Sequence, residues 1–484
     1  MLKGLTQPLS YSESRWFFIV ASLFVVAASL SVILYNPLPL IIPIALVGAV
    51  FIIAKPRIFY YLFFFLLPFS MEIELPGGFG TDIPSEPLML ILMGVCVLYL
   101  VMNADKKMTN VIRHPISLLL ILHLVWILFT SIYSTNQVFS IKFFLAKIWY
   151  VLPFYFLPLL LLRGVKDQSA VFKWFSVGLL ISVSYVMLRH AGMGFGFDTI
   201  NKAVRPIYRN HVNYGILLVA ILPYLVYLIK TRKKLNGLVA YGSLMFLLLA
   251  IYLTYTRAAH ISVVLGIGVY LVIKWKLAKQ AILISMAGAI LGLSYLAIDN
   301  NYLDHAPEYT KAIEHKKFDN LVEATTKMED ISTVERFYRW VAGFNMLKER
   351  PVTGFGPSTF YTNYKSYTVS SYKTYVSDNP EKSGIHNYYL MTAVEQGIPG
   401  LLIFIGFCMI CILYGEKAYH QLVDKEEKAL VMAATVCLVI ILAVLIINDL
   451  LEADKVGPIF FLSASLIAFY SHRHRESEPS ALKP

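Results

Sequence analysis

The stretch from Ser332 to Gly400 ends in two motifs, Gly384-Ile-His-Asn-Tyr-Tyr-Leu390 and Val394-Glu-Gln-Gly-Ile-Pro-Gly400. It belongs to the one long polar interval of a chain that otherwise consists of apolar runs. Such an interval is expected outside the hydrocarbon core, because lipid offers no partners to exposed backbone groups or charges. We therefore expect the chemistry of this protein to be found there.

The composition predicts an all-α polytopic membrane protein. Of the 484 residues, 57% are hydrophobic and only 15% are charged, a balance that a soluble chain of this length does not carry. Apolar runs of about 17 to 22 residues recur, and each can cross a hydrocarbon core of roughly 30 Å as a helix. We expect about 12–14 transmembrane helices and one large, partly helical loop on the outer side. The predicted domains are residues 1–298 (eleven helices), 299–397 (the loop with its catalytic segment) and 398–484 (three helices and a tail).

The distribution of basic residues predicts the orientation of these helices. Alternate short loops are rich in Lys and Arg, which is typical of the cytoplasmic side. The loop from Met71 to Glu86 lies on the other side and carries four acids but no base. We therefore expect both termini in the cytoplasm and the large loop on the outer side of the membrane.

A few basic residues fall at the outer ends of spans, where the positive-inside rule does not put them. They are Lys142, Lys147, Arg189, Lys202, Arg205, Arg209 and Arg257. One interpretation is that they extend to the lipid headgroups. The other is a pocket for a phosphate-rich ligand, because an arginine fork binds phosphate oxygens at two points and stays charged.

The outer loop is predicted to contain a helix that runs from a capping box at Ser332-Thr-Val-Glu335 to Glu349 and is stopped by Pro351. Arg336 and Trp340 are four residues apart and share a face of that helix. An apolar face is formed by Val334, Phe337, Val341, Phe344 and Leu347. A run of tyrosines follows, for which a membrane-interface position and a sugar-stacking surface are both open: Tyr361, Tyr364, Tyr367, Tyr372 and Tyr375.

His386 is the candidate catalytic base. It joins the polar loop to a membrane helix on the side of the outer arginines, and a neutral imidazole there could take a proton from a sugar hydroxyl. The following helix is expected to run from His386 to Gln396 and to break at Gly397-Ile-Pro-Gly400. Glu395 lies nine residues after His386, on the opposite helical face, so we expect it to be a structural or supporting residue.

Four segments in sequence order, between Arg205 and Phe404, resemble the O-antigen ligase and O-antigen polymerase superfamily of bacterial envelope glycosyltransferases. The first two are Arg205-Pro-Ile-Tyr-Arg-Asn-His-Val-Asn-Tyr214 and Leu253-Thr-Tyr-Thr-Arg-Ala-Ala259. The third is Arg336-x-x-x-Trp340 with the turn Pro351-x-x-Gly354-x-Gly356 and Phe360. The fourth is His386-Asn-x-Tyr-Leu390 with Glu395-x-Gly397-x-x-Gly400.

The resemblance implies a metal-independent, cofactor-free, inverting glycosyltransferase with a GT-C-like helical fold in the bacterial inner membrane, with its active site in the periplasm. Its donor would be a glycan on undecaprenyl pyrophosphate, its acceptor a glycan, lipid A-core or protein, and no nucleic acid would be bound. His386 would be the base. Substrate would be bound by Arg257 with Arg205 or Arg209, by Arg336 and by Tyr389; Asn387, Trp340 and Glu395 would support the site. The acids Asp449, Glu452 and Asp454 leave a metal site open as an alternative.

Departures from the family pattern leave the subfamily open. Asn210-His-Val-Asn213 replaces an Asn-Pro-Asn segment, and Ala258 replaces a glycine. Arg205 and Arg209 compete for one role. The function expected first is a ligase acting on lipid A-core or a similar acceptor, with a polymerase or a protein O-oligosaccharyltransferase as alternatives. A flippase of lipid-linked oligosaccharide is the alternative from another class, although no internal repeat is visible.

Overall fold

The computed structural model describes residues 11–35, 43, 48, 51–75, 79–102, 111–231, 237–297, 331–369, 377 and 384–477. The chain divides into two compact units, Met1–Leu62 and Phe63–Pro484. The first unit contains α1 (Tyr11–Ile33) and the start of α3 (Pro56–Leu66). Residues 299–330 of the predicted loop, with Tyr372 and Tyr375 of the tyrosine run, lie outside the described residues.

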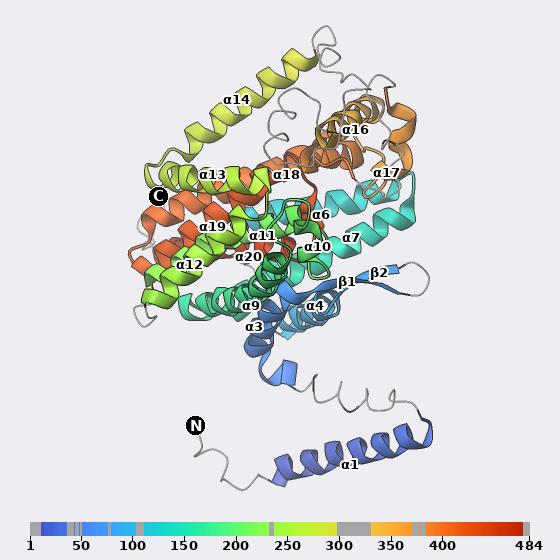
Figure 1. The fold of residues 1–484 in the computed structure, drawn as a ribbon, viewed down its shortest axis with the longest axis vertical. Coiled ribbons are helices and arrows are strands. Elements are labelled where there is room, and N and C mark those ends of the chain that lie inside the picture. The colour runs from blue at the N-terminus through green and yellow to red at the C-terminus, as the bar shows by residue number, and fades with distance from the viewer. Residues whose placement is uncertain are drawn as a thin grey trace, which may run out of the picture. The chain divides into compact units, whose positions relative to one another are not determined.

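The described part of the second unit is helical apart from one hairpin and the connecting loops (Figure 1). A π-helical segment, Leu152–Phe156, joins α7 to α8. The helices are α4 (Ser85–Met102), α6 (Pro115–Ile132), α7 (Gln137–Val151), α8 (Leu157–Leu161), α9 (Val165–Gly192), α10 (Ile200–Val204), α11 (His211–Thr231), α12 (Gly237–Tyr252), α13 (Arg257–Lys274), α14 (Ala278–Ala297), α16 (Ile331–Glu349), α17 (Phe360–Asn363), α18 (Tyr388–Gln421), α19 (Lys425–Val444) and α20 (Gly457–Ser477).

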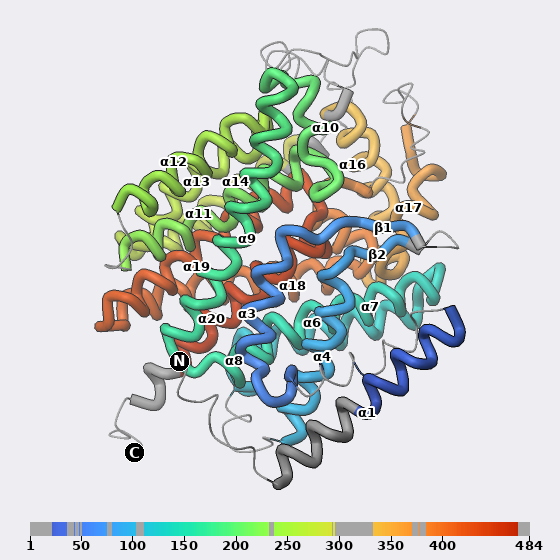
Figure 2. Tube along the Cα trace, turned by 60° about the horizontal axis from the view of Figure 1, so that its bottom comes forward, coloured from blue at the N-terminus to red at the C-terminus, as the bar shows by residue number. Residues whose placement is uncertain are grey.

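Eight helical stretches of the described chain are long and apolar enough to cross a membrane, and five further apolar helices are shorter. The protein is therefore an all-α polytopic membrane protein, as its composition predicts. In the second unit α19 packs against α11, α13, α18 and α20, and α18 packs against α6. Helices α12 and α13 lie beside α11 (Figure 2), and α14 packs against α13 and α18. All three expose many apolar side chains, as lipid-facing helices do.

A β-hairpin that the sequence did not predict lies between α3 and α4. Its strands, β1 (Met71–Leu75) and β2 (Phe79–Ile83), pair antiparallel with Met71 opposite Ile83. The apolar–polar alternation in these strands covers only five residues each, which is why the surrounding apolar runs concealed it. The hairpin brings the acids of this loop toward the candidate site described below.

The predicted helix after Ser332 is α16, which ends at Glu349 as expected. Its start was predicted wrongly: α16 already includes Ile331, so Ser332 lies inside the helix and does not cap it. The carboxylate of Glu335 accepts a hydrogen bond from Ser377 Oγ at 2.6 Å and pairs with Arg339 at 3.4 Å. One partner of this carboxylate is thus local to α16, and the other lies beyond the helix.

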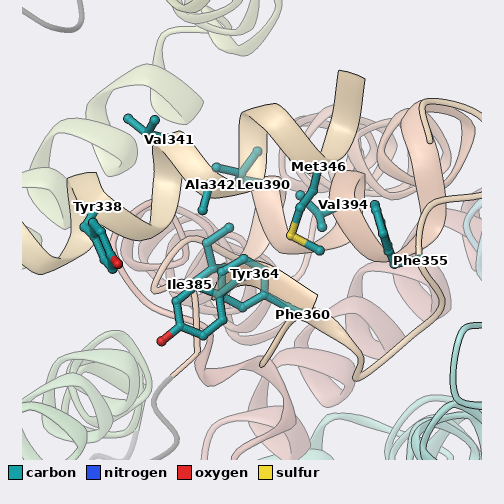
Figure 3. Close-up of a cluster of buried hydrophobic side chains, with 10 residues drawn as sticks. All are labelled: Tyr338, Val341, Ala342, Met346, Phe355, Phe360, Tyr364, Ile385, Leu390 and Val394. Carbon is teal, nitrogen blue, oxygen red and sulfur yellow. The ribbon is translucent and has the colours of Figure 1, made fainter. Parts of the chain in front are cut away.

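An apolar cluster fixes α16 over the start of α18 (Figure 3). From α16 it takes Tyr338, Val341, Ala342 and Met346, and these face Ile385, Leu390 and Val394. The cluster is completed by Phe355, Phe360 and Tyr364 from the turn between the two helices. Burying this face holds the segment around His386 between α16 and α18.

Candidate active site

The helix break predicted at Gly397 is present, and the turn of residues 351–356 forms backbone hydrogen bonds on both sides of it. Gly397 has φ 73° inside α18, so helical hydrogen bonding is interrupted there. The amides of Phe355 and Gly356 donate to the carbonyls of Val394 (3.0 Å) and Glu395 (2.9 Å), and Ile398 N donates to Pro351 O (2.8 Å). A Cβ atom at Gly397 would collide with a backbone carbonyl of this turn, so glycine is required.

Glu395 has the structural role expected from its position. Its carboxylate is buried and accepts hydrogen bonds from the amides of Ser358 (2.8 Å) and Phe360 (3.0 Å). Burying this charge without a partner would cost free energy, and the hydrogen bonds from the two amides offset that cost. Glu395 thus fixes the turn that fills the break and does not orient His386.

The loop of residues 384–387 is held by side chains from α16. Arg339 Nη1 donates to the carbonyl of Gly384 at 3.2 Å, and Trp340 Nε1 donates to that of Ile385 at 3.0 Å. Asn387 caps α18 by accepting from Leu390 N at 2.9 Å, so the helix starts at Tyr388 and not at His386 as predicted.

His386 itself precedes α18 in a left-handed conformation, with φ 55°. A residue with a side chain adopts this conformation only when its surroundings impose it, and such positions cluster at functional sites. The carbonyl contacts from α16 and the cap of α18 impose it here. The imidazole is consequently fixed at the end of the bundle with 31% of its side chain exposed.

Asp449, in the loop between α19 and α20, lies directly against His386. Its carboxylate oxygen is 3.8 Å from His386 Nδ1, and it accepts a hydrogen bond from the His386 backbone amide. A Cβ atom at position 384 would collide with this carboxylate, which explains the glycine there. His386 Nδ1 has no hydrogen-bond partner among the described residues, so a small approach by Asp449 would complete an Asp–His pair.

Burial and three nearby arginines keep the imidazole of His386 neutral. Burial, followed by the positive charges of Arg336, Arg339 and Arg209, lowers the pKa of His386 to about 3. Burial also raises the pKa of Asp449. The hydrogen bond from the His386 amide and the positive charges of Arg339 and Arg209 partly offset this increase. At neutral pH the histidine therefore carries a free lone pair, the form that a general base requires.

Arg205 and Arg209 line a cavity of about 470 Å³, which we call the arginine cavity. Its other walls come from β1 and β2 through Glu72 and Asp82, and from residues 452–456. Both arginines are exposed, and neither forms an ion pair or hydrogen bond with the described residues. Only Arg209 is among the charges that affect His386 and Asp449.

The acids of the arginine cavity are largely neutralised. Asp454 pairs with Lys455 at 3.1 Å, and Glu452 forms an ion pair with Lys147. Burial and the nearby Asp454 carboxylate raise the pKa of Asp82 to about 7, so it is partly protonated at neutral pH. With Glu72 counted as one opposing carboxylate, the two arginines leave a small excess of positive charge, and this favours an anionic ligand.

Lys147 anchors the loop that carries Asp449. It is 3% exposed, pairs with Glu452 and donates to Tyr388 Oη at 2.9 Å. Tyr388 Oη donates to Glu452 at 2.8 Å, and Tyr150 Oη donates to the Glu452 carbonyl at 2.8 Å. Neither interpretation of the outer basic residues applies to Lys147, which forms a buried ion pair.

Two further residues predicted to bind substrate lie in other surroundings. Arg257 begins α13, and its neighbour Thr256 donates to the carbonyl of His211 at 3.2 Å, so the Arg257 turn packs on the start of α11. Arg257 is not among the charges that shift the pKa of His386. The hydroxyl of Tyr389 donates to the carbonyl of Leu442 at 2.9 Å and so serves helix packing.

No group of three or more His, Cys, Asp or Glu side chains within the described ranges could hold a metal ion. The three acids considered as an alternative metal site have separate partners instead: Asp449 has His386, Glu452 has Lys147 and Asp454 has Lys455.

Arg339 and the pairing role of Asp449 were missed by the sequence analysis. Arg339 could have been noticed, because it lies three residues after Arg336 on the same helix and four after Glu335. Asp449 carried no local signal of its role, because 62 residues lie between it and His386 in the sequence.

The fold and this site define a polytopic membrane protein with a basic, histidine-containing centre at one end of its helix bundle. Residues 242–405, from α12 into α18, match the family model described as O-antigen ligase. This match covers about a third of the chain and supports the O-antigen ligase superfamily. The matched segment includes Arg257, Arg336 and His386 but not Arg205 or Arg209. No curated protein matches the chain.

Proposed function

We propose that this protein is an O-antigen ligase-like inverting glycosyltransferase, which moves a glycan from undecaprenyl pyrophosphate to an acceptor hydroxyl in the periplasm. The observation that carries the proposal is the centre itself. A neutral histidine lies beside a carboxylate and within the field of three arginines, in a domain of the O-antigen ligase family. This combination provides a base for the hydroxyl and positive charge for a diphosphate leaving group.

In the proposed reaction the acceptor hydroxyl oxygen attacks the anomeric carbon of the donor sugar from the face opposite the diphosphate. The new carbon–oxygen bond forms as the bond from that carbon to the diphosphate oxygen breaks, which inverts the configuration. The hydroxyl proton passes to Nε2 of His386. Asp449, facing Nδ1, is a positioning residue that stabilises the imidazolium so formed.

The arginines would couple donor binding to the strength of the base. Their charges hold the pKa of His386 low in the free protein. A bound diphosphate offsets those charges, so the pKa of His386 rises in the complex and the imidazole becomes a stronger base. Arg209 is our choice over Arg205 for the contact nearest the leaving group, because its charge reaches both His386 and Asp449.

Purified protein reconstituted in lipid vesicles tests the proposal. A defined undecaprenyl pyrophosphate-linked glycan is offered with lipid A-core, with a second donor molecule or with a Ser/Thr peptide. The wild type should transfer the glycan to one of these and release undecaprenyl pyrophosphate in equal amount, without added metal. His386→Ala should bind donor but not transfer it.

Transfer by His386→Ala at the wild-type rate would exclude the proposed base. If the wild type transferred to no acceptor but moved the lipid-linked glycan across the bilayer, the protein would be a flippase. The acceptor that receives the glycan separates ligase, polymerase and protein O-oligosaccharyltransferase.

A further inference from the structure

A second cavity, of about 510 Å³, opens beside the His386 loop on the side of α7. We call it the aromatic cavity, because its walls include Phe139, Phe143, Trp149, Tyr150, Phe360 and Tyr361. Its volume lies within the roughly 300–1,000 Å³ of ligand pockets. Gly384 and Asp449 form part of its lining, so it reaches the carboxylate that faces His386.

Several polar groups of this cavity already have partners within the protein. The carboxylate of Glu395 is taken up by two backbone amides, and that of Glu452 by Lys147 and Tyr388. Trp149 Nε1 is different: it is inaccessible to solvent and has no hydrogen-bond partner within the described residues. An indole N–H is a donor only, and leaving it unpaired is unfavourable. Lys142 also lines the cavity without an ion pair to the described residues.

We propose that the aromatic cavity binds a sugar residue of the acceptor, and that the Trp149 ring turns on binding so that Nε1, closed off from solvent in the free protein, donates to one of the sugar oxygens. This inference rests on the proposed function and names the acceptor class. Aromatic rings offer apolar faces to the C–H side of a sugar ring, while the carboxylates of Asp449 and Glu86 accept from its hydroxyls. A purely apolar occupant would offer the indole N–H no acceptor.

The position of the cavity suits an acceptor and not the leaving group. Its titratable lining contains Glu86, Glu395, Asp449 and Glu452 against Lys142, so it lacks the excess of positive charge found in the arginine cavity. A diphosphate would be repelled there, whereas a neutral sugar would not. Glu452 borders both cavities, which places acceptor and donor on two sides of the same loop.

Steady-state kinetics with Trp149→Phe tests the assignment, because phenylalanine keeps the ring and removes the N–H. The acceptor KM should rise about three- to tenfold, the effect of losing one hydrogen bond, with the donor KM unchanged. Tyr361→Ala, on the surface turn of α17, should raise the acceptor KM in the same direction. Trp275→Phe is the matched control, since Trp275 is 61% exposed and lines neither of these cavities, and it should leave both KM values unchanged.

A binding measurement separates this inference from the proposed reaction. Lipid-free core oligosaccharide is titrated into His386→Ala protein, and the quenching of tryptophan fluorescence is compared with that of His386→Ala/Trp149→Phe protein. Binding weakened at least threefold by Trp149→Phe supports the cavity, even if no transfer occurs. Equal binding by both proteins, a change in the donor KM alone, or Trp149-dependent binding of a Ser/Thr peptide in place of the oligosaccharide would overturn it.

Discussion

The arginine cavity and the aromatic cavity are similar in size but differ in the groups that line them. The first is formed by the 205–213 segment, the hairpin and residues 452–456, and it presents two uncommitted arginines. The second is formed mainly by α7 and the turn at Phe360, and it presents rings and an unpaired indole N–H. The arginine cavity provides positive charge, and the aromatic cavity provides a surface of aromatic rings.

This difference corresponds to the two tasks of a glycosyl transfer. A diphosphate leaving group accumulates negative charge, which fixed guanidinium groups stabilise best. An acceptor sugar stays neutral until it loses a proton, so it is selected by stacking and hydrogen bonds. Asp449, which faces His386, lines the aromatic cavity, and the charge of Arg209 from the arginine cavity acts on His386. The following predictions test whether the two tasks are divided in this way.

The largest effect is expected for His386→Ala, because this variant lacks the base that would take the proton from the acceptor hydroxyl. We expect kcat to fall by about 10²–10⁴, with donor affinity retained. Transfer kinetics and donor binding on the same preparation measure both. A parallel loss of donor affinity would place His386 in the donor site and remove the division between the cavities.

The next effect compares two arginines of one cavity. Arg209→Ala should raise the donor KM about 10- to 100-fold, corresponding to a charged hydrogen bond of about 1.5–3 kcal/mol. Arg205→Ala is the matched control and should act less, because its charge does not reach His386. An equal effect of both substitutions would show that the leaving group lies in the middle of the cavity, and a change in acceptor KM would contradict the assignment.

Arg257→Ala tests whether the donor extends beyond this cavity. The family resemblance predicts that it weakens donor capture more than acceptor binding. Donor and acceptor affinities measured on vesicles would decide this. An unchanged donor affinity would confine the diphosphate to the neighbourhood of Arg209.

Asp449→Asn should reduce kcat by about tenfold, since the amide keeps the size of the side chain but stabilises the imidazolium less. The acceptor and donor KM values should stay near those of the wild type. The pH dependence of kcat provides a second readout, because loss of the carboxylate should move its acid limb to lower pH. A normal kcat with the wild-type profile would leave Asp449 a purely structural residue.

The smallest effect concerns pH. With the pKa of His386 at about 3, kcat/KM should lack an acid limb between pH 5 and 8, because the imidazole is already neutral throughout. Arg336→Gln removes one positive charge, so the pKa of His386 should rise and the acid limb should move to higher pH. Burial is the larger cause, so the return toward the ordinary value should be partial. An acid limb near pH 6.5 in the wild type would contradict a His386 imidazole that is neutral throughout this pH range.

The sequence by itself determined the class of protein and the segment that carries the candidate base. Hydropathy is a local property, so the apolar runs, the helix ending at Glu349 and the break at Gly397 could be predicted. The hairpin could not, because its strands are short. The start of α16 could not, because the capping-box pattern from Ser332 to Glu335 lies within the helix. The periplasmic orientation and the domain boundaries stay predictions.

The tertiary structure decided which residues meet. It brings Arg209 and Asp449 to His386, assigns Glu395 to the turn at Phe360, and places Trp149 of α7 beside Asp449 in the aromatic cavity. These residues are far apart in the chain, and helical periodicity carries no information on which helices become neighbours. Packing of buried faces determines that, and it alone converts a histidine at the end of one helix into a centre between two cavities.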